Sequence, residues 1–275
     1  MKYFFLFITI LSIQGCQPSE PRPGKTLLSG VTFSLGRHKV LTTTEFSFKY
    51  KYNSKNQLIE RQQIGSDVVR KTPVNYYLEY NQEGKISRIK TSDSSLYFLT
   101  YRPDSILVDA IRDSTSTIIF NGKKEYRTKS RTIYLLNEKG LITERNNFSE
   151  RYKIEYFPDD NIARYYPFGA SVGRGYNGYS EYSTLLNPYA SSPELALLET
   201  LFTRTWESWT AAQPYFNCQS RNWPLKRKRD NFTYLNSQKV VGTTADLYPT
   251  EVVEQDDNGN AVSNGFTIRF DYINQ

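Results

Sequence analysis

The amino-acid sequence predicts a mainly β protein, in which an antiparallel meander of serial hairpins forms a curved sheet or an incomplete barrel. Aromatic residues make up 15% of the 275 residues, with 22 Tyr and 16 Phe, and this composition favours strands. A pattern of two alternating apolar stretches joined by a polar turn recurs along much of the chain. One stretch at about 193–212 has helical spacing, and we expect this helix to cover the apolar face or to plug an end.

The first residues are typical of an exported bacterial lipoprotein. Lys2 precedes the apolar run 3–13, which would rise only about 16 Å as a helix, roughly half of a hydrocarbon core. This length predicts that residues 1–15 are a signal peptide. The sequence Ile13-Gln14-Gly15-Cys16 resembles a lipobox, in which cleavage leaves Cys16 to be acylated. The alternative is an ordinary secretory signal with an incidental cysteine.

The rest of the chain divides into a tether and one domain. Residues 16–30 are expected to form the tether, because Pro18, Pro21 and Pro23 favour a stiff, extended chain. Residues 31–275 are numerous enough for one large core. We assign them to a single β-rich domain with a loop-helix insertion at 167–229.

The hairpin repeat predicts which face of the sheet is buried. Because strand side chains alternate between faces, Phe48 and Tyr50 share one face while Lys49 and Lys51 share the other. One apolar face and one wet face indicate a sheet that is covered on one side. The repeat aromatics are therefore predicted to be core, and the alternative is a ligand-binding stripe. The aligned anchor positions are Tyr52, Tyr80, Tyr101, Leu136 and Tyr156, in the segments 46–64, 76–90, 97–113, 133–148 and 152–166, and a further copy covers 252–262 with 265–272.

The polar turns of the repeat predict a special backbone conformation. Asn-Gln-Glu-Gly at 81–84 and Asn-Glu-Lys-Gly at 137–140 suit a type I turn closed by a residue in the left-handed region. Glycine adopts that region at the least cost. We therefore predict a positive φ at the turn glycines Gly84, Gly140 and Gly259.

The repeat is interrupted after Tyr166. Residues 167–191 are rich in Gly, Ser and Tyr and predict a long loop. Ser192 then suits a helix N-cap, with Pro193 at the first helical position and Glu194 in the first turn. A second loop contains the basic run 226–229, and strands resume at Phe232. The apolar face of the predicted helix carries Leu195, Leu198, Phe202, Trp206 and Trp209.

The inventory of reactive residues argues against most enzyme classes. His38 is the single histidine and Cys218 the single cysteine after Cys16, which excludes a histidine-based zinc site and a cysteine metal cluster. We expect no metal, no cofactor and no catalytic residue. The pairs Asp159-Asp160 and Asp256-Asp257 leave open a glycan-processing enzyme that uses carboxylates. Both pairs, however, lie in predicted turns, where Asp is favoured.

Charge and loop composition predict the kind of partner. The formal net charge of +7 favours, in an exported protein, anionic glycans or lipid headgroups over nucleic acid. We predict a non-catalytic binding or structural role at the membrane, with a glycan, a lipid or an envelope protein as partner. The loops 167–191 and 213–229 are the predicted partner-binding surface, because function resides in loops more often than in scaffold strands. The candidate residues are Arg174, Tyr176, Tyr179, Tyr182, Tyr189 and Arg221.

Several motifs resemble known families. The tyrosine-rich hairpins look like YD (RHS-type) repeats. The segment 247–253, followed by Asp257-Asn258-Gly259 and the closing Phe270-Asp271-Tyr272, resembles a family of Bacteroidota lipoproteins, a domain of unknown function with a porin-like β fold. This resemblance covers roughly residues 40–275 and implies a lipid-anchored location at the outer membrane. The family has no established activity, so the resemblance implies no catalytic residues.

Overall fold

The computed structural model describes the chain from residue 26 to residue 274 with internal gaps. The described residues are 26–35, 44–65, 73–111, 118–120, 123–125, 129–147, 151–167, 177–202, 219–229, 232–256, 258, 260 and 265–274. The predicted signal peptide, Cys16 and residues 17–25 of the tether therefore lie outside the described residues. Residues 26–30, which the sequence assigned to the tether, belong instead to the first strand, β1 (Thr26–Leu35).

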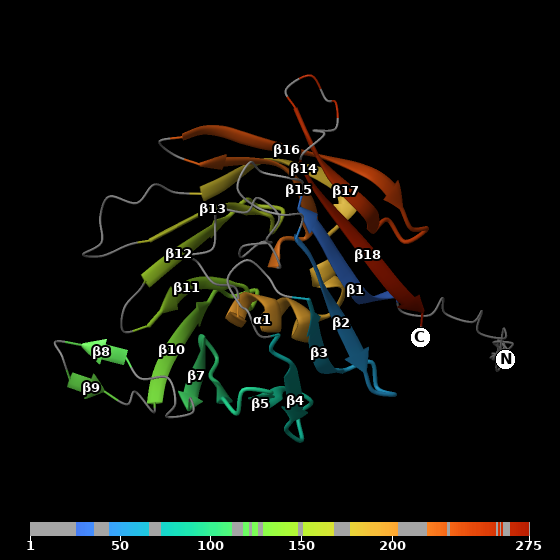
Figure 1. Ribbon diagram of the computed structural model, residues 1–275. Helices are drawn as coiled ribbons and strands as arrows, with labels where there is room; N and C mark the ends of the chain where they lie inside the picture. The colour runs from blue at the N-terminus through green and yellow to red at the C-terminus, as the bar shows by residue number, and fades with distance from the viewer. Residues whose placement is uncertain are drawn as a thin grey trace, which may run out of the picture.

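The described strands form one antiparallel meander that closes on itself (Figure 1). Most neighbours in the sheet are neighbours in the sequence, and β1 completes the ring by pairing with both β2 and β18. A separate pair, β8 (Ile118–Phe120) and β9 (Lys123–Glu125), lies between β7 and β10. The barrel strands are β1 (Thr26–Leu35), β2 (Thr44–Tyr52), β3 (Leu58–Ile64), β4 (Tyr76–Tyr80), β5 (Ile86–Thr91), β6 (Leu96–Tyr101), β7 (Ser105–Ile111), β10 (Lys129–Leu136), β11 (Ile142–Asn146), β12 (Arg151–Tyr156), β13 (Ile162–Pro167), β14 (Asn177–Leu186), β15 (Asn222–Arg229), β16 (Phe232–Thr243), β17 (Pro249–Gln255) and β18 (Phe266–Asn274).

The predicted fold class is confirmed, and the sheet is more complete than the sequence alone indicates. The hairpins pair in series, as β2 with β3, β4 with β5, β10 with β11, and β12 with β13. Closure depends on β1 and β18, which lie at opposite ends of the domain and pair from Thr26–Asn274 to Leu35–Phe266. No local pattern could predict a contact between segments so far apart in the sequence.

The hairpin turns have the geometry that the repeat predicts. In the turn 81–85, the Gly84 amide donates to the Asn81 carbonyl oxygen at 3.0 Å, and the Asn81 side chain accepts from the Lys85 amide at 2.9 Å. The turn at 137–141 repeats both bonds. Gly84 has φ +75° and Gly140 has φ +78°, as expected, while Gly259 lies outside the described residues.

Replacing Gly140 by Val should isolate the backbone requirement of these turns. A β-carbon at Gly140 would meet nothing within 4 Å, so steric contact with other residues adds no cost. We expect a loss of about 1–2 kcal/mol in the free energy of unfolding, because a β-branched residue is strained at positive φ. Urea denaturation would measure it. Gly140→Asn should lose much less, since Asn56 already adopts φ +62° in an equivalent turn. Equal losses for Val and Asn would contradict this explanation.

The helix α1 (Pro193–Phe202) lies inside the barrel rather than on its outer surface (Figure 1). It starts where the sequence predicts, because the Ser192 side chain accepts the Leu195 amide at 3.3 Å as an N-cap. A short 3₁₀ helix, η1 (Pro188–Ser191), leads into it. The predicted continuation through 212, with Trp206 and Trp209, lies outside the described residues.

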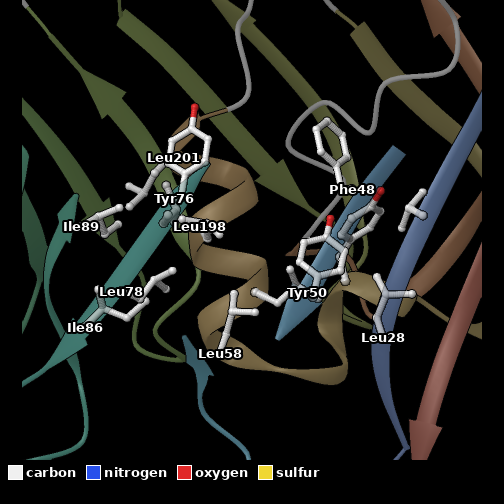
Figure 2. Packing of buried hydrophobic residues seen from close by; sticks show 14 of the residues in the cluster. Leu28, Phe48, Tyr50, Leu58, Tyr76, Leu78, Ile86, Ile89, Leu198 and Leu201 are labelled. Carbon is white, nitrogen blue, oxygen red and sulfur yellow. The ribbon is translucent and has the colours of Figure 1, made fainter. Parts of the chain in front are cut away.

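The hydrophobic core lies between α1 and the inner face of the strands. Leu198 and Leu201 of α1 point among the strand side chains Leu58, Leu78 and Ile89 (Figure 2). The repeat aromatics Phe48, Tyr50 and Tyr76 are buried in the same cluster, as predicted, whereas Lys49 and Lys51 on the outer face are exposed. The prediction that the repeat tyrosines belong to the core is therefore confirmed for the described strands, where they are buried or packed against the core.

The expected insertion at 167–229 contains two strands of the barrel. β14 and β15 pair with each other, and through β13 and β16 they continue the ring. Register shifts on both sides of Glu181 break the period-two pattern between Tyr179 and Tyr182, which explains why the sequence resembled a loop. The basic run 226–229 likewise belongs to β15 and not to a loop.

Candidate functional site

A buried ion pair fixes α1 inside the barrel. Glu199 of α1 is 6% exposed, and Arg61 of β3 is 7% exposed. The two side chains meet through two parallel contacts, Nε to Oε1 at 2.6 Å and Nη2 to Oε2 at 3.3 Å. The Tyr50 hydroxyl donates to the same Oε1 at 3.0 Å. Three donors thus surround one carboxylate in the interior.

Aromatic rings complete this site. Tyr50, Arg61 and Tyr76 stand opposite one another in register on β2, β3 and β4. The Arg61 guanidinium carbon lies 3.8 Å from the centre of the Phe48 ring and 5.0 Å from that of Tyr76. Such cation–π contacts partly compensate a desolvated cation. The site therefore holds a charged pair within an aromatic cage.

The electrostatics of the cage keep its groups in defined protonation states. Burial raises the pKa of the Tyr50 hydroxyl well above its ordinary value, and the nearby negative charge of Glu199 raises it further. Burial alone would lower the pKa of Arg61, but the attraction of Glu199, the neighbouring Tyr50 and Tyr76 and the hydrogen bond to Glu199 together raise it. Tyr50 therefore stays a neutral donor, and Arg61 stays a cation.

Tyrosine hydroxyls ring one end of the barrel, which we call the tyrosine end. This end carries the turns 53–57, 81–85, 137–141, 157–161 and 244–248. At this end, five tyrosine hydroxyls in the described part of the chain each donate to a backbone carbonyl oxygen on the preceding strand. The bonds are Tyr52 to Leu28 at 2.8 Å, Tyr80 to Leu58 at 2.6 Å, Tyr156 to Ile142 at 2.7 Å, Tyr182 to Ile162 at 2.6 Å, and Tyr272 to Pro249 at 2.6 Å.

Residues 219–222 cross the tyrosine end and bond to it. Gln219 accepts the amide of Ile142 at 2.9 Å and the hydroxyl of Tyr156 at 3.0 Å. The Ser220 hydroxyl accepts the amide of Ile162 at 3.1 Å. These contacts were not predictable from the sequence, because the partners of 219–222 come from distant hairpins and no local pattern marks them. Together with η1, this segment places protein across this end of the barrel.

These tyrosines predict a loss of stability in alkaline solution. Burial, followed by the charge of Glu194, raises the pKa of Tyr101 to about 12, and burial raises the pKa values of Tyr52, Tyr80 and Tyr156 as well. An unfolded tyrosine loses its proton near pH 10. The free energy of unfolding should therefore be unaffected by these groups below about pH 10 and fall as the pH rises through about 12.

Urea denaturation at several pH values would measure this effect, with tyrosinate absorbance as a second signal. We expect the exposed tyrosines of the folded protein to ionise first, and the absorbance of the buried tyrosines to appear only above about pH 11 or on unfolding. Ionisation of these tyrosines near pH 10 without loss of structure would contradict the hydrogen-bonded ring.

The predicted partner-binding tyrosines do not form an exposed surface. Tyr179 is 7% exposed and Tyr189 is 1% exposed. The Tyr189 ring packs edge-to-face on Phe270 at 6.4 Å, and the Tyr179 ring lies 5.9 Å from that of Tyr182, whose hydroxyl belongs to the tyrosine end. This placement corrects the expectation of an exposed tyrosine surface, because packing accounts for these three residues.

Of the other three residues of that prediction, Arg174, Tyr176 and Arg221, the structure describes Arg221. Arg221 is exposed beside the tyrosine end. Arg174 and Tyr176 lie outside the described residues, so their role stays a prediction. In the described part of the chain, no group of three or more His, Cys, Asp and Glu side chains gathers to hold a metal ion.

The outer face of the barrel is charged. Ion pairs join adjacent strands at intervals around the ring, and their side chains are partly or largely exposed. The pairs are Lys51–Glu60 at 2.7 Å, Arg88–Glu79 at 3.3 Å, Arg131–Asp109 at 2.7 Å, Arg164–Glu155 at 2.5 Å, Lys226–Glu181 at 2.6 Å and Arg269–Glu251 at 3.1 Å. Among the described residues, no helix is both long and apolar enough to cross a membrane.

These features define the class of the molecule as an antiparallel β-barrel with an apolar interior, an internal helix and a charged outer face. No known protein family matches the sequence, and no curated protein matches it either. The predicted membership in a lipoprotein family and the resemblance to YD repeats thus have no support from sequence comparison.

Solved structures with a similar chain path do exist. A porin-like protein from Bacteroides uniformis ATCC 8492 matches with a TM-score of 0.49 and 12% identity, over 91% of this chain and 98% of that chain. A porin-like protein from Bacteroides vulgatus ATCC 8482 matches with a TM-score of 0.35 and 12% identity, over 90% of this chain and 99% of that chain. Similarity at this level says nothing about what the chain binds or does.

Proposed function

We propose that the protein is a non-catalytic barrel of the bacterial cell envelope, tethered to the outer membrane by lipid on Cys16 and standing in water beside it. The observation that carries this proposal is the ring of exposed ion pairs on the outer face. A Lys or Arg facing lipid at the bilayer midplane costs about 2–4 kcal/mol. In water, such pairs are neutral or slightly favourable. The barrel wall is therefore suited to water, and a lipid anchor would keep it at the membrane.

The tether sets the orientation of the barrel. Thr26 begins β1 at the tyrosine end, where it pairs with Asn274 of β18. Residues 17–25 separate Thr26 from Cys16, and a proline-rich chain of this length extends about 28 Å at about 3.1 Å per residue. The tyrosine end would thus stay close to the membrane, while the opposite end faces away. In this arrangement, the opposite end is the one that meets a glycan, a lipid or an envelope protein.

Replacing Cys16 by Ala should abolish lipidation. The sequence Ile13-Gln14-Gly15-Cys16 provides one acceptor for the acyl chains. We expect cells that express the wild type to incorporate radiolabelled palmitate into this protein, and cells that express the variant to leave it unprocessed or soluble. Label in the variant, or none in the wild type, would overturn the anchor.

A protease site placed within 17–25 separates anchoring from insertion. If the lipid alone holds the barrel, cleavage of isolated membranes should release a soluble, folded fragment. A barrel that remained with the membrane after complete cleavage would contradict the water-facing wall. Cleavage of the same membranes without the engineered site is the matched control.

The alternative function is a glycan-processing enzyme that uses carboxylates. At both candidate aspartate pairs, however, the described carboxylates have a structural role in a turn. Asp159 accepts the Asn161 amide at 3.2 Å within a turn, and Asp160 has φ +68° and pairs with Lys139. Asp256 accepts the amides of Asn258 and Asn260 at 2.9 and 2.8 Å. Turn formation accounts for these three carboxylates, while Asp257 lies outside the described residues.

A further inference from the structure

The described strands contain two rows in which an arginine stands between two tyrosines of the adjacent strands, and the first of these rows binds Glu199. Arg61 stands between two inward-facing tyrosines on β2 and β4, and Arg145 stands between two inward-facing tyrosines on β10 and β12. Each arginine is the fourth residue of its strand. Both hairpins also shift register at the same place, just before the turn. The two rows are Tyr50–Arg61–Tyr76 and Tyr134–Arg145–Tyr152.

The first row shows what such a site binds. Arg61 presents Nε and Nη2 to the two oxygens of the Glu199 carboxylate, and Tyr50 adds its hydroxyl to one of them. A planar guanidinium fork matches the two oxygens of a carboxylate, and this match gives the pair its geometric specificity. Here the carboxylate comes from α1 of the same chain.

The second row has the same residue types without a carboxylate from the described residues, and here the arginine is itself hydrogen-bonded to the Tyr134 hydroxyl. The Nε and Nη1 atoms of Arg145 are buried, and neither has a hydrogen-bond partner within the described part of the chain. Tyr134 beside it is 2% exposed. An unpartnered donor that has lost its water is costly, and a charged one more so. Arg145 as a whole residue is only partly buried.

One difference between the rows leaves more room at the second. Phe48, two residues before Tyr50, covers the guanidinium of Arg61 at 3.8 Å. The corresponding residue, two before Tyr134, is Thr132. A threonine side chain is much smaller than a phenyl ring, so this position cannot cover Arg145 in the same way.

We propose that Arg145 and Tyr134 form a binding site for the carboxylate of a small acidic solute, such as an acidic sugar. The carboxylate accepts from the guanidinium of Arg145, and the Tyr134 hydroxyl, which accepts from Arg145, keeps its own proton to donate to the same carboxylate. The proposal deepens the binding role proposed above and rests on it, but it does not depend on the lipid anchor.

Titration of the full chain in detergent solution tests the site. D-Glucuronate and acetate are the carboxylate probes, and D-glucose is the neutral control, all at constant ionic strength. The Nε–H signals of ¹⁵N-labelled arginines report binding directly, and the signal lost in Arg145→Met identifies the residue. We expect both carboxylates, but not glucose, to shift the Arg145 signal.

Two conservative variants give the matched comparison. Arg145→Lys should weaken D-glucuronate binding at least about tenfold, because an ammonium keeps the charge but lacks the planar fork. Arg131→Lys changes an exposed arginine on the neighbouring strand, which pairs with Asp109, and should leave the affinity unchanged. Circular dichroism and the amide spectrum show that each variant is folded. Equal binding by wild type and Arg145→Lys would overturn the site.

A second carboxylate from the chain itself is the competing source. Glu207 lies outside the described residues and belongs to the segment that follows α1. We expect Glu207→Gln to bind D-glucuronate as the wild type does. If Glu207→Gln bound D-glucuronate and the wild type did not, the proposal would be overturned, because the guanidinium of the wild type would then be paired with the chain's own carboxylate. Failure of palmitate labelling would refute the anchor and leave this result untouched.

Discussion

Replacing Arg61 by Met is expected to lower the free energy of unfolding by about 3–5 kcal/mol, because it leaves the buried carboxylate of Glu199 without its cation. Glu199 is 6% exposed, so water cannot replace the lost partner without opening the barrel. The Tyr50 hydroxyl still donates to Glu199 in the variant, but a neutral donor compensates a buried charge poorly. Urea denaturation followed by circular dichroism would measure the loss.

The double variant Arg61→Met with Glu199→Leu distinguishes a lost charge from lost packing. Replacing both members of a buried pair by apolar residues is often neutral or stabilising. We therefore expect the double variant to recover most of the stability that the single variant loses. Arg131→Met, at an exposed arginine, should change stability by less than about 1 kcal/mol. A double variant as unstable as Arg61→Met would mean that the pair is not the cause.

The sequence could predict this site only in part. The period-two pattern places Tyr50 on the inner face, and helical spacing places Leu195 and Leu198 on the apolar face of α1. Glu199 follows Leu198 directly, and nothing in the local sequence distinguishes it from a charged residue on the exposed face of a helix. Its partner Arg61 lies 138 residues earlier in the sequence. Only closure of the barrel around α1 brings the two together, and no local pattern encodes that contact.

The other differences between sequence and structure have the same cause. Hairpins with regular turns, such as 81–85 and 137–141, were predictable because their signals lie within a few residues of one another. β14 was not, because its irregular register hides the alternation of Tyr179 and Tyr182. The tyrosine anchors were predicted as core, whereas their hydroxyls also bond to backbone carbonyls of earlier strands. The pattern of apolar residues indicates which side chains are buried, but it does not indicate which groups they hydrogen-bond to.

Trp223 gives the second large expected effect. The sequence places it in a loop beside Pro224, but the structure places it in β15 with its side chain 2% exposed. Its ring packs edge-to-face on Phe270 at 5.2 Å, and its indole Nε1–H donates to Gln238 Oε1 at 3.0 Å. It therefore joins β15, β16 and β18 within the core. Trp223→Ala should lower the free energy of unfolding by about 3–5 kcal/mol, because it removes a large ring and leaves a cavity.

Trp223→Phe separates the ring from its hydrogen bond. Phenylalanine keeps most of the packing against Phe270 but leaves the buried Gln238 oxygen without the indole donor. We expect an intermediate loss of about 1–3 kcal/mol. Thermal and urea denaturation of both variants would give the two values under the same conditions. If Trp223→Ala were as stable as the wild type, this tryptophan would not be part of the core, and the placement of β15 in the barrel would be wrong.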